Sequence, residues 1–336
     1  MKKKNIFNPL GNDSKEYRQL LEGNSTNLFN LNNVKYEWGI SLYNKMLSQF
    51  WIPQKIDLTQ DITDYNNLTI YEKKAFNGIL SFLIFLDSIQ TINIPRISDY
   101  ITAPEVTLAL SAHQFQEAVH VQSYQYIIES VVPYDERNNI YDYWRTDEIL
   151  LNRNKYIADI YQLFSDDPSI DNFKKVIVAN YILESVYFYN GFNYFYNLAS
   201  RHLMQGTSDI IRYITKDEAV HTVLFQRIIQ ELNIDSNLIY ELISVAVEHE
   251  INWTNHIVNN VLGVNATSTE QYTKNLANRR LISLGLKPLY EGFDSNPYKH
   301  LERIADTEDK AEVKGNFFES TVTSYQMSTS VPDGDW

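Results

Sequence analysis

Apolar residues recur along this chain mainly at the spacing of α-helices. Aliphatic and aromatic side chains return every three or four positions, the period of a helix with one buried face. Alternating runs closed by Asn-Gly turns, which are typical of strands, are scarce. The pattern predicts helices over 35–49, 70–95, 103–131, 147–164, 170–201, 206–231, 236–261 and 268–286. We therefore expect an all-α protein.

Two of these helices have start signals. Thr69 with Glu72, and likewise Thr102 with Glu105, have the spacing of a capping box, in which each side chain accepts a hydrogen bond from the other residue's backbone N–H. Pro104 falls in the first turn of its helix, where a missing N–H costs nothing. Both pairs predict that a helix starts close to the threonine.

The segment 176–200 is apolar on nearly all sides. Its sequence, VIVANYILESVYFYNGFNYFYNLAS, carries one charge, Glu184, and is long enough to cross a bilayer. Its four asparagines and central carboxylate would be costly there. We therefore favour the buried central helix of a large bundle over a membrane span. The acid in its middle then requires a physical reason.

The chain changes character after about residue 300. Its last segment is polar, with spaced aromatic residues and no helical stripe. One interpretation is a frayed terminus, and the other is a tail that becomes ordered on a partner. We expect a helical domain over 1–300 and a flexible tail over 301–336.

Composition narrows the chemistry. The chain has no cysteine, which excludes disulfides, thiolate metal sites and cysteine nucleophiles, and is compatible with a reducing cytoplasm. Its 42 acidic and 29 basic residues give a net charge of −13, and no basic face is evident, so we expect no nucleic-acid partner. The N-terminus has three lysines but no apolar stretch behind them, unlike a signal peptide.

The motif Glu-x-x-His occurs twice, each time as Glu-Ala-Val-His within a predicted helix. One copy runs from Glu117 to His120 and the other from Glu218 to His221. Residues three apart share one face of a helix, so each copy points a carboxylate and an imidazole at the same point. A single copy could arise by chance, but two identical copies predict a metal site.

A buried cation site needs more negative charge than two glutamates supply. Asp87 follows the uncharged run AFNGILSFLIFL, and Glu184 is the sole charge of its segment. Two Glu-x-x-His helices and two helices with single carboxylates form the dimetal site of ferritin-like bundles. Alternatively, Asp87 could end a buried helix and Glu184 could pair with a core arginine. The ligand types favour iron or manganese over zinc.

The other histidines fit this site less directly. His113 lies one turn before Glu117 on the same face; it could be a ligand, but we expect it to hold a carboxylate by a hydrogen bond. His249, Glu250 and His256 cluster beside polar residues of a later helix, and we interpret them as a solvated face.

Four blocks of sequence together resemble a known family. They are LDSIQ from Leu86, EAVHVQSY from Glu117, LESVYFYNGF from Leu183 and KDEAVH from Lys216, preceded by FWIP from Phe50. In order and spacing they are similar to the small, radical-generating subunit of class I ribonucleotide reductase. The resemblance covers roughly residues 35–300 and resumes at the extreme C-terminus.

The resemblance implies a ferritin-like helical bundle with extra flanking helices and a dinuclear metal centre. The positions that match the family's ligands are Asp87, Glu117 and His120 for one metal and Glu184, Glu218 and His221 for the other. Tyr124 falls on the position of the stable tyrosyl radical, nearly two turns beyond Glu117 on the same face. The positions that match the apolar radical pocket are Phe188, Phe192 and Ile214.

The resemblance also implies an activity and partners. As the small subunit of a ribonucleoside-diphosphate reductase, the protein would use its reduced dimetal site to activate O2 and form the Tyr124 radical, which the large subunit uses to make deoxyribonucleotides. The transfer route would run through His120, Asp217, Trp51 and the tail residue Tyr325. We expect di-iron, with dimanganese as the alternative, a tail that docks on the large subunit, a homodimer, a cytoplasmic location and no membrane contact.

Two other functions stay open for such a site. One is a different dimetal carboxylate enzyme, such as an oxidase, a monooxygenase component or a desaturase. The other is a ferritin-like iron store. An aspartate at position 87, Tyr124 and Tyr325 argue against the first, and the chain's length and tail tyrosine argue against the second.

Overall fold

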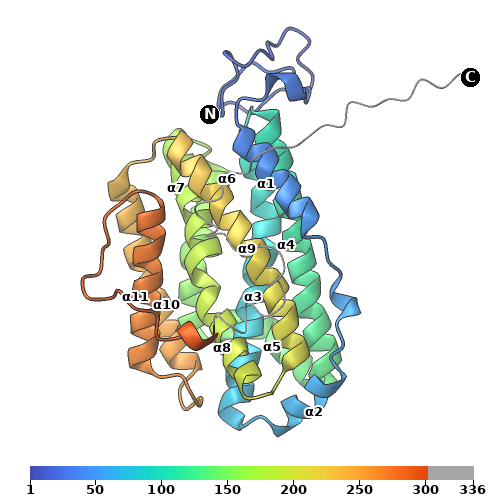
Figure 1. Ribbon diagram of the computed structural model, residues 1–336, viewed down its shortest axis with the longest axis vertical. Helices are drawn as coiled ribbons and strands as arrows, with labels where there is room; N and C mark the ends of the chain where they lie inside the picture. The colour runs from blue at the N-terminus through green and yellow to red at the C-terminus, as the bar shows by residue number, and fades with distance from the viewer. Residues whose placement is uncertain (302–336) are drawn as a thin grey trace, which may run out of the picture. The chain divides into compact units, whose positions relative to one another are not determined.

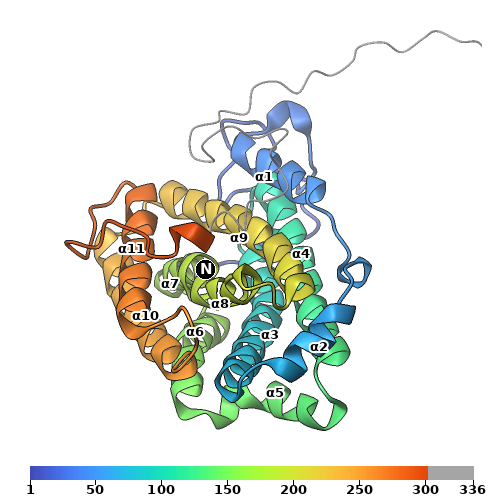
Figure 2. The same cartoon turned by 60° about the horizontal axis from the view of Figure 1, so that its bottom comes forward.

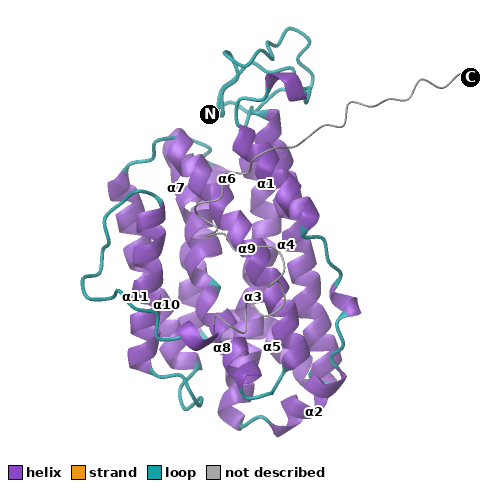
Figure 3. Cartoon of the chain, viewed as in Figure 1, coloured by secondary structure: helices purple, strands orange, loops and turns teal. Residues whose placement is uncertain are grey.

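The computed structural model describes residues 1–301, which form helices joined by loops (Figure 1). The helices are α1 (Glu37–Ser48), α2 (Thr59–Asn67), α3 (Ile70–Ser98), α4 (Pro104–Val131), α5 (Tyr134–Thr146), α6 (Glu148–Asp166), α7 (Ile170–Ile182), α8 (Tyr189–Ser200), α9 (Gln205–Glu231), α10 (Ser236–Ile257) and α11 (Ala266–Ser283). Short 3-10 turns, η1 (Leu31–Asn33) and η2 (Pro53–Lys55), flank α1. The all-α prediction is confirmed, because this part of the chain contains no strand beyond one isolated bridge (Figure 3).

Most predicted helices lie within a few residues of their expected bounds, but the pattern does not predict α2 or α5. α5 buries only Ile140, and α2 buries two aspartates beside Tyr65. Neither helix therefore has the apolar stripe that marks a helix in sequence. The predicted tail lies almost entirely in 302–336, outside the described residues.

The predicted helix 170–201 is interrupted at its centre. α7 ends at Ile182, a π-helical turn, η3 (Leu183–Tyr187), follows, and α8 begins at Tyr189. Such a turn holds an extra residue and changes the direction of the side chains on it. Side chains of three other helices donate to its carbonyls: Thr222 Oγ1 to Glu184 at 3.1 Å, Arg280 Nε to Ser185 at 3.0 Å and Arg153 Nη2 to Tyr187 at 2.7 Å.

One of the two predicted capping boxes is present. Thr69 accepts from the Glu72 N–H at 3.2 Å, and Glu72 accepts from the Thr69 N–H at 2.9 Å. The second box is wrong: α4 does begin at Pro104, but its N-cap is Ala103 and makes no side-chain cap. Glu105 instead accepts from Arg18 at 2.8 Å and from the backbone N–H groups of residues 35 and 36. It therefore anchors the N-terminal segment.

α3 continues past Asp87 as far as Ser98, so this acid does not end a helix. Pro95 lies inside the last turns and has no N–H for the carbonyl of Thr91. That carbonyl accepts instead from Gln114 Nε2 on α4 at 3.3 Å. Packing against α4 thus lets α3 run on through the proline.

Four helical segments form the centre of the bundle: α3, α4, α9 and the segment that contains η3. α3 packs along α4, and α9 packs against α4, α7 and α8 (Figure 2). α1 covers α4 and α9, α6 packs against α7 and α10, and α11 packs on the outer side of α10. The segment 176–200 is buried nearly throughout, as predicted. α3 is long and apolar enough to cross a membrane, but 61% of its most apolar window is buried inside the protein, as in a core helix.

The interpretation of His249, Glu250 and His256 as a solvated face is wrong. Glu250 is fully buried and accepts from Arg153 Nε on α6 at 2.6 Å. His256 contacts Asp147 at 2.8 Å, and His249 is partly buried. The partners of Glu250 and His256 come from distant parts of the chain, which spacing along α10 cannot reveal.

The buried pair predicts an asymmetric response to mutation. Arg153→Met should lower the free energy of unfolding of the metal-free protein by about 3 to 5 kcal/mol, because it leaves the Glu250 carboxylate buried and unpaired. Urea unfolding followed by circular dichroism measures this change. Lys155→Met, which removes an exposed ion pair of the same helix, should cost no more than about 1 kcal/mol. Equal losses in the two variants would contradict the role of burial, and adding Glu250→Leu to Arg153→Met should recover part of the loss.

Candidate metal centre

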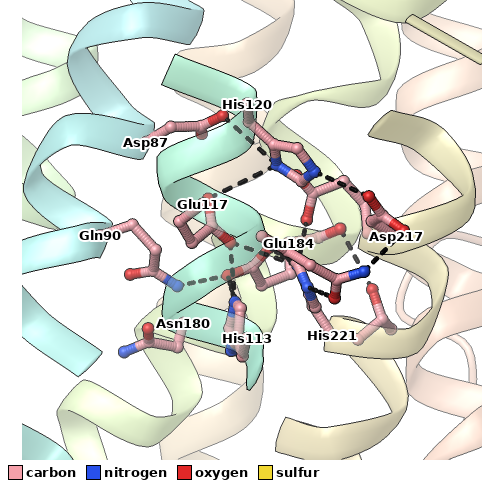
Figure 4. A network of polar contacts seen from close by, with 12 residues as sticks. Asp87, Gln90, His113, Glu117, His120, Asn180, Glu184, Asp217 and His221 are labelled. Atoms are coloured by element: carbon pink, nitrogen blue, oxygen red, sulfur yellow. Dashed lines mark hydrogen bonds and ion pairs between the residues drawn. The ribbon is translucent and has the colours of Figure 1, made fainter. Parts of the chain in front are cut away.

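The six predicted ligands converge at the centre of the bundle, and Figure 4 labels five of them, all but Glu218. Asp87 comes from α3, Glu117 and His120 from α4, Glu184 from η3, and Glu218 and His221 from α9. Every one of these side chains is fully buried. The alternative pairing of Glu184 with a core arginine is not seen, because Gln90 and the histidines His113 and His221 lie against its carboxylate instead.

The potential ligand atoms fall into two groups, in each of which all atoms lie within 4.8 Å of one another. The groups are Asp87, Glu117, His120 and Glu218, and His113, Glu117, Glu184 and His221. Glu117 lies 3.7 Å from Nδ1 of His120 and 3.2 Å from Nδ1 of His221, and Glu218 lies 3.2 Å and 3.0 Å from the same two atoms. Both glutamates thus lie between the two histidines, and Glu117 belongs to both groups.

Many polar atoms that face this centre make no hydrogen bond. They are both oxygens of Asp87, Oε2 of Glu117, Oε2 of Glu184, Oε1 of Glu218 and Nδ1 of His120. Burying such atoms without a partner is costly, and coordination to a metal removes the cost. The donor set of carboxylates and imidazoles fits two cations of the iron or manganese type.

Without a cation, the four carboxylates do not share one protonation state. Burial and the charge of Glu117 raise the pKa of Asp87 well above its usual range, and burial with the charges of Glu184 and Glu117 does the same for the pKa of Glu218. Burial acts on Glu117 as well, but hydrogen bonds from histidines outweigh it and hold the pKa of Glu117 well below its usual range. Cations that bind here therefore displace protons.

Nε2 of each motif histidine, the ring nitrogen that faces away from the carboxylates, is connected to Asp217 by hydrogen bonds. His120 Nε2 lies 3.1 Å from Asp217 Oδ2, the contact predicted from the sequence, and Trp51 Nε1 donates to the same oxygen at 2.9 Å. Gln116 completes the link, because it accepts from His221 Nε2 at 3.0 Å and donates to Asp217 Oδ1 at 2.9 Å. Sequence reasoning missed Gln116, although it lies one turn before His120 on α4.

His113 occupies the position expected of a residue that holds a carboxylate. Its Nε2 lies 2.7 Å from Glu117 Oε1 and 3.1 Å from Glu184 Oε1. Burial alone would lower the pKa of His113, but the charges and hydrogen bonds of the two glutamates raise it to about 9. Gln90, which the sequence analysis did not single out, donates to the same oxygen of Glu184.

Tyr124 is fully buried, and its hydroxyl makes no hydrogen bond of good geometry. Burial and the charge of Asp87 raise the pKa of Tyr124 well above its ordinary value, so the phenol keeps its proton. Phe188, Phe192 and Ile214 are buried as well. Tyr325 lies outside the described residues.

Two helices with Glu-x-x-His and two further segments with single carboxylates form the arrangement of the ferritin-like dimetal proteins. Residues 28–297 match the family model described as ribonucleotide reductase, small chain. The chain is 40% identical to the ribonucleoside-diphosphate reductase subunit beta of Treponema pallidum, over 99% of this chain and 97% of that protein. The chain therefore belongs to the ribonucleotide reductase small-chain family.

Solved structures agree with this assignment. The ribonucleotide reductase R2 subunit from Clostridium botulinum superimposes with a TM-score of 0.87 at 46% identity, covering 91% of this chain and 99% of that one. The dimanganese(II)-NrdF of Streptococcus sanguinis has a TM-score of 0.72 at 23% identity, covering 82% of this chain and 98% of that one, and shows the shared fold.

The raised pKa of Glu218 predicts opposite effects of one substitution on stability and metal binding. Glu218→Gln should stabilise the metal-free protein at pH 8 by roughly 1 to 3 kcal/mol, because the amide removes an acid that is costly to ionise in the folded state. The gain should shrink as the pH falls towards 5, where the folded protein keeps this carboxyl protonated. Calorimetry in the presence of a chelator measures both values.

The same variant should lose metal affinity, so that manganese raises its melting temperature less than it raises that of the unmodified protein. A metal-free variant that melts below the unmodified protein at pH 8 would contradict the assignment of Glu218 as a poorly ionised acid.

Proposed function

We propose that this chain holds a dinuclear metal centre at the cluster of Asp87, Glu117, His120, Glu184, Glu218 and His221, and uses it to form a radical on Tyr124. The large subunit would use this radical to make deoxyribonucleotides from ribonucleoside diphosphates. The observation that carries the proposal is the convergence of unpartnered, buried ligand atoms on which the buried phenol of Tyr124 also borders. Membership of the small-chain family supports it and implies a large partner subunit.

The protein's own residues would position the bound cations, supply negative charge and exclude water from the site. When two redox-active cations are bound, they supply the activation of O2 that oxidises the phenol. The six ligands would hold the cations between four helical segments, and the buried aromatic and aliphatic side chains around them exclude water. The hydroxyl of Tyr124 gives up one electron and its proton in this step, and O2 is the oxidant. The charge of Asp87 acts on the pKa of this hydroxyl more strongly than that of any other acid, and Asp87 is our candidate to accept the proton.

A chain of hydrogen bonds supports the proposed route out of the centre. It runs from His120 through Asp217 to the indole N–H of Trp51, which is only partly buried. Phe50 and Phe115 are exposed next to Trp51 and stack with ring centres 6.1 Å apart. These three side chains and Gln116 line a pocket at the surface. An apolar surface at this end of the route suits contact with the large subunit.

We favour iron as the metal, with manganese as the alternative, because the same carboxylate and imidazole ligands suit both. The absence of cysteine supports a reducing cytoplasm and leaves any thiol chemistry to the partner. A homodimer and a tail over 301–336 that docks on the large subunit through the region of Tyr325 complete the proposal.

Tyr124→Phe tests the radical role. The variant should keep two metals per chain but lose the organic-radical EPR signal after iron loading and exposure to oxygen, and lose turnover with the large subunit. Tyr187→Phe is the matched control, because Tyr187 is also fully buried with an unpartnered hydroxyl. It should keep the signal. A radical that persists in Tyr124→Phe would refute the role, and bulk ferric mineral in the unmodified protein would indicate iron storage.

Removing residues 316–336 tests the tail. The truncated chain should keep two metals and its radical but lose binding to the large subunit in surface plasmon resonance, because the ligands all lie before residue 302. The full-length Tyr325→Phe variant should bind normally yet lose turnover, which separates docking from radical transfer. Normal binding by the truncated chain would remove the tail from the proposal.

A further inference from the structure

Glu184 is the one acid of the centre that comes from an irregular turn. The pairs Glu117–His120 and Glu218–His221 stand three residues apart on regular helices, which fix their common direction. Glu184 lies in η3, where no neighbouring ligand shares its face. Its direction therefore depends on side chains of other helices.

Two donors converge on one oxygen of Glu184. Gln90 Nε2 donates to Oε1, and His113 Nε2 lies 3.1 Å from the same atom (Figure 4). The amide of Gln90 has a fixed orientation, because its own Oε1 accepts from the Tyr161 hydroxyl at 2.8 Å and its NH2 must then face Glu184. The other oxygen, Oε2, makes no hydrogen bond and lies 3.6 Å from Nδ1 of His221. One oxygen is thus held and the other is free to face a cation.

The ring of His113 is placed as a hydrogen-bond donor rather than as a ligand. It lies over the ring of His221 with centres 3.7 Å apart and planes 30° apart. Two imidazoles on neighbouring corners of one metal point at it and spread away from each other, whereas these two rings lie one over the other. Nε2 of His113 faces Oε1 of both Glu117 and Glu184, and a proton on this nitrogen serves both oxygens.

We propose that His113 and Gln90 form a clamp that holds Oε1 of Glu184, so that Glu184 offers the cation on the His221 side a single oxygen, Oε2. This inference rests on the dinuclear centre proposed above. Asp87 provides the contrast, because neither of its oxygens makes a hydrogen bond of good geometry and both can face the cation on the His120 side. His113 is then a positioning residue for one half of the centre, and the two cations differ in their carboxylate environment.

Titration of the metal-free protein with Mn²⁺ under argon tests the clamp, with free Mn²⁺ followed by EPR. The unmodified chain should bind two ions. His113→Leu should keep one ion at normal affinity and bind the other about 10- to 100-fold more weakly, the usual effect of losing a residue that orients a ligand. Gln90→Leu should weaken the same ion. His113→Gln restores an N–H donor and should recover most of the affinity, while a value no better than that of His113→Leu would count against the hydrogen bond.

A remote histidine and a crystal structure complete the test. His256→Gln removes a histidine–carboxylate contact of 2.8 Å far from the centre and should titrate like the unmodified chain. Thermal melting of the metal-free variants verifies that they fold. In crystals of the Mn²⁺-loaded unmodified protein, Glu184 should bind through Oε2 alone. Coordination by Nε2 of His113, binding through both oxygens of Glu184, or an unchanged titration of His113→Leu would overturn the clamp. An unmodified chain that fails to bind two ions would instead refute the dinuclear centre itself.

Discussion

Four carboxylates buried among four helical segments create the electrostatic constraint on which the rest of this protein depends. Two other buried acids each have a guanidinium partner: Glu105 pairs with Arg18, and Glu250 with Arg153. At the centre the carboxylates face histidines, and part of the charge is suppressed by protons on Asp87 and Glu218. The folded chain thus contains a buried site whose negative charge is balanced only when cations bind. Family membership and the proposed radical chemistry both agree with this demand for cations.

Local spacing along the chain predicted much of the site, because helical geometry converts spacing into direction. The two Glu-x-x-His motifs and the lone acid Asp87 all lie on long regular helices, where this rule holds. It failed where partners are distant in sequence. Glu250 meets an arginine 97 residues away, and Glu105 meets one 87 residues away, so neither pairing leaves a local pattern. The π-helical turn at Glu184 escaped notice because a segment that is apolar on all sides has no stripe whose phase could reveal an extra residue.

Asp217 joins the two halves of the site on the side away from the carboxylates. It receives His120 and Trp51 on one oxygen and Gln116 on the other, and Gln116 in turn accepts from His221. Both motif histidines are thereby turned so that Nδ1 faces the centre. The residue that fixes these rings is also the one that contacts the partly buried indole. A change in the position of Trp51 would therefore alter the hydrogen bonds that orient both histidines. The carboxylate of Asp217 alone makes this link between the surface and the centre.

The carbonyls of the π-helical turn have a consequence for protein design. They accept hydrogen bonds from Arg153 on α6, Arg280 on α11 and Thr222 on α9, and neither α6 nor α11 contributes a carboxylate or imidazole to the cluster. A miniature scaffold built from the four central segments would retain every ligand in its sequence but lose two of these three donors. Relaxation of the turn to a regular α-helix would rotate Glu184 by about 100°, the angle of one residue. α6 and α11 therefore belong to the smallest part of the chain that could carry the ligand cluster into another protein.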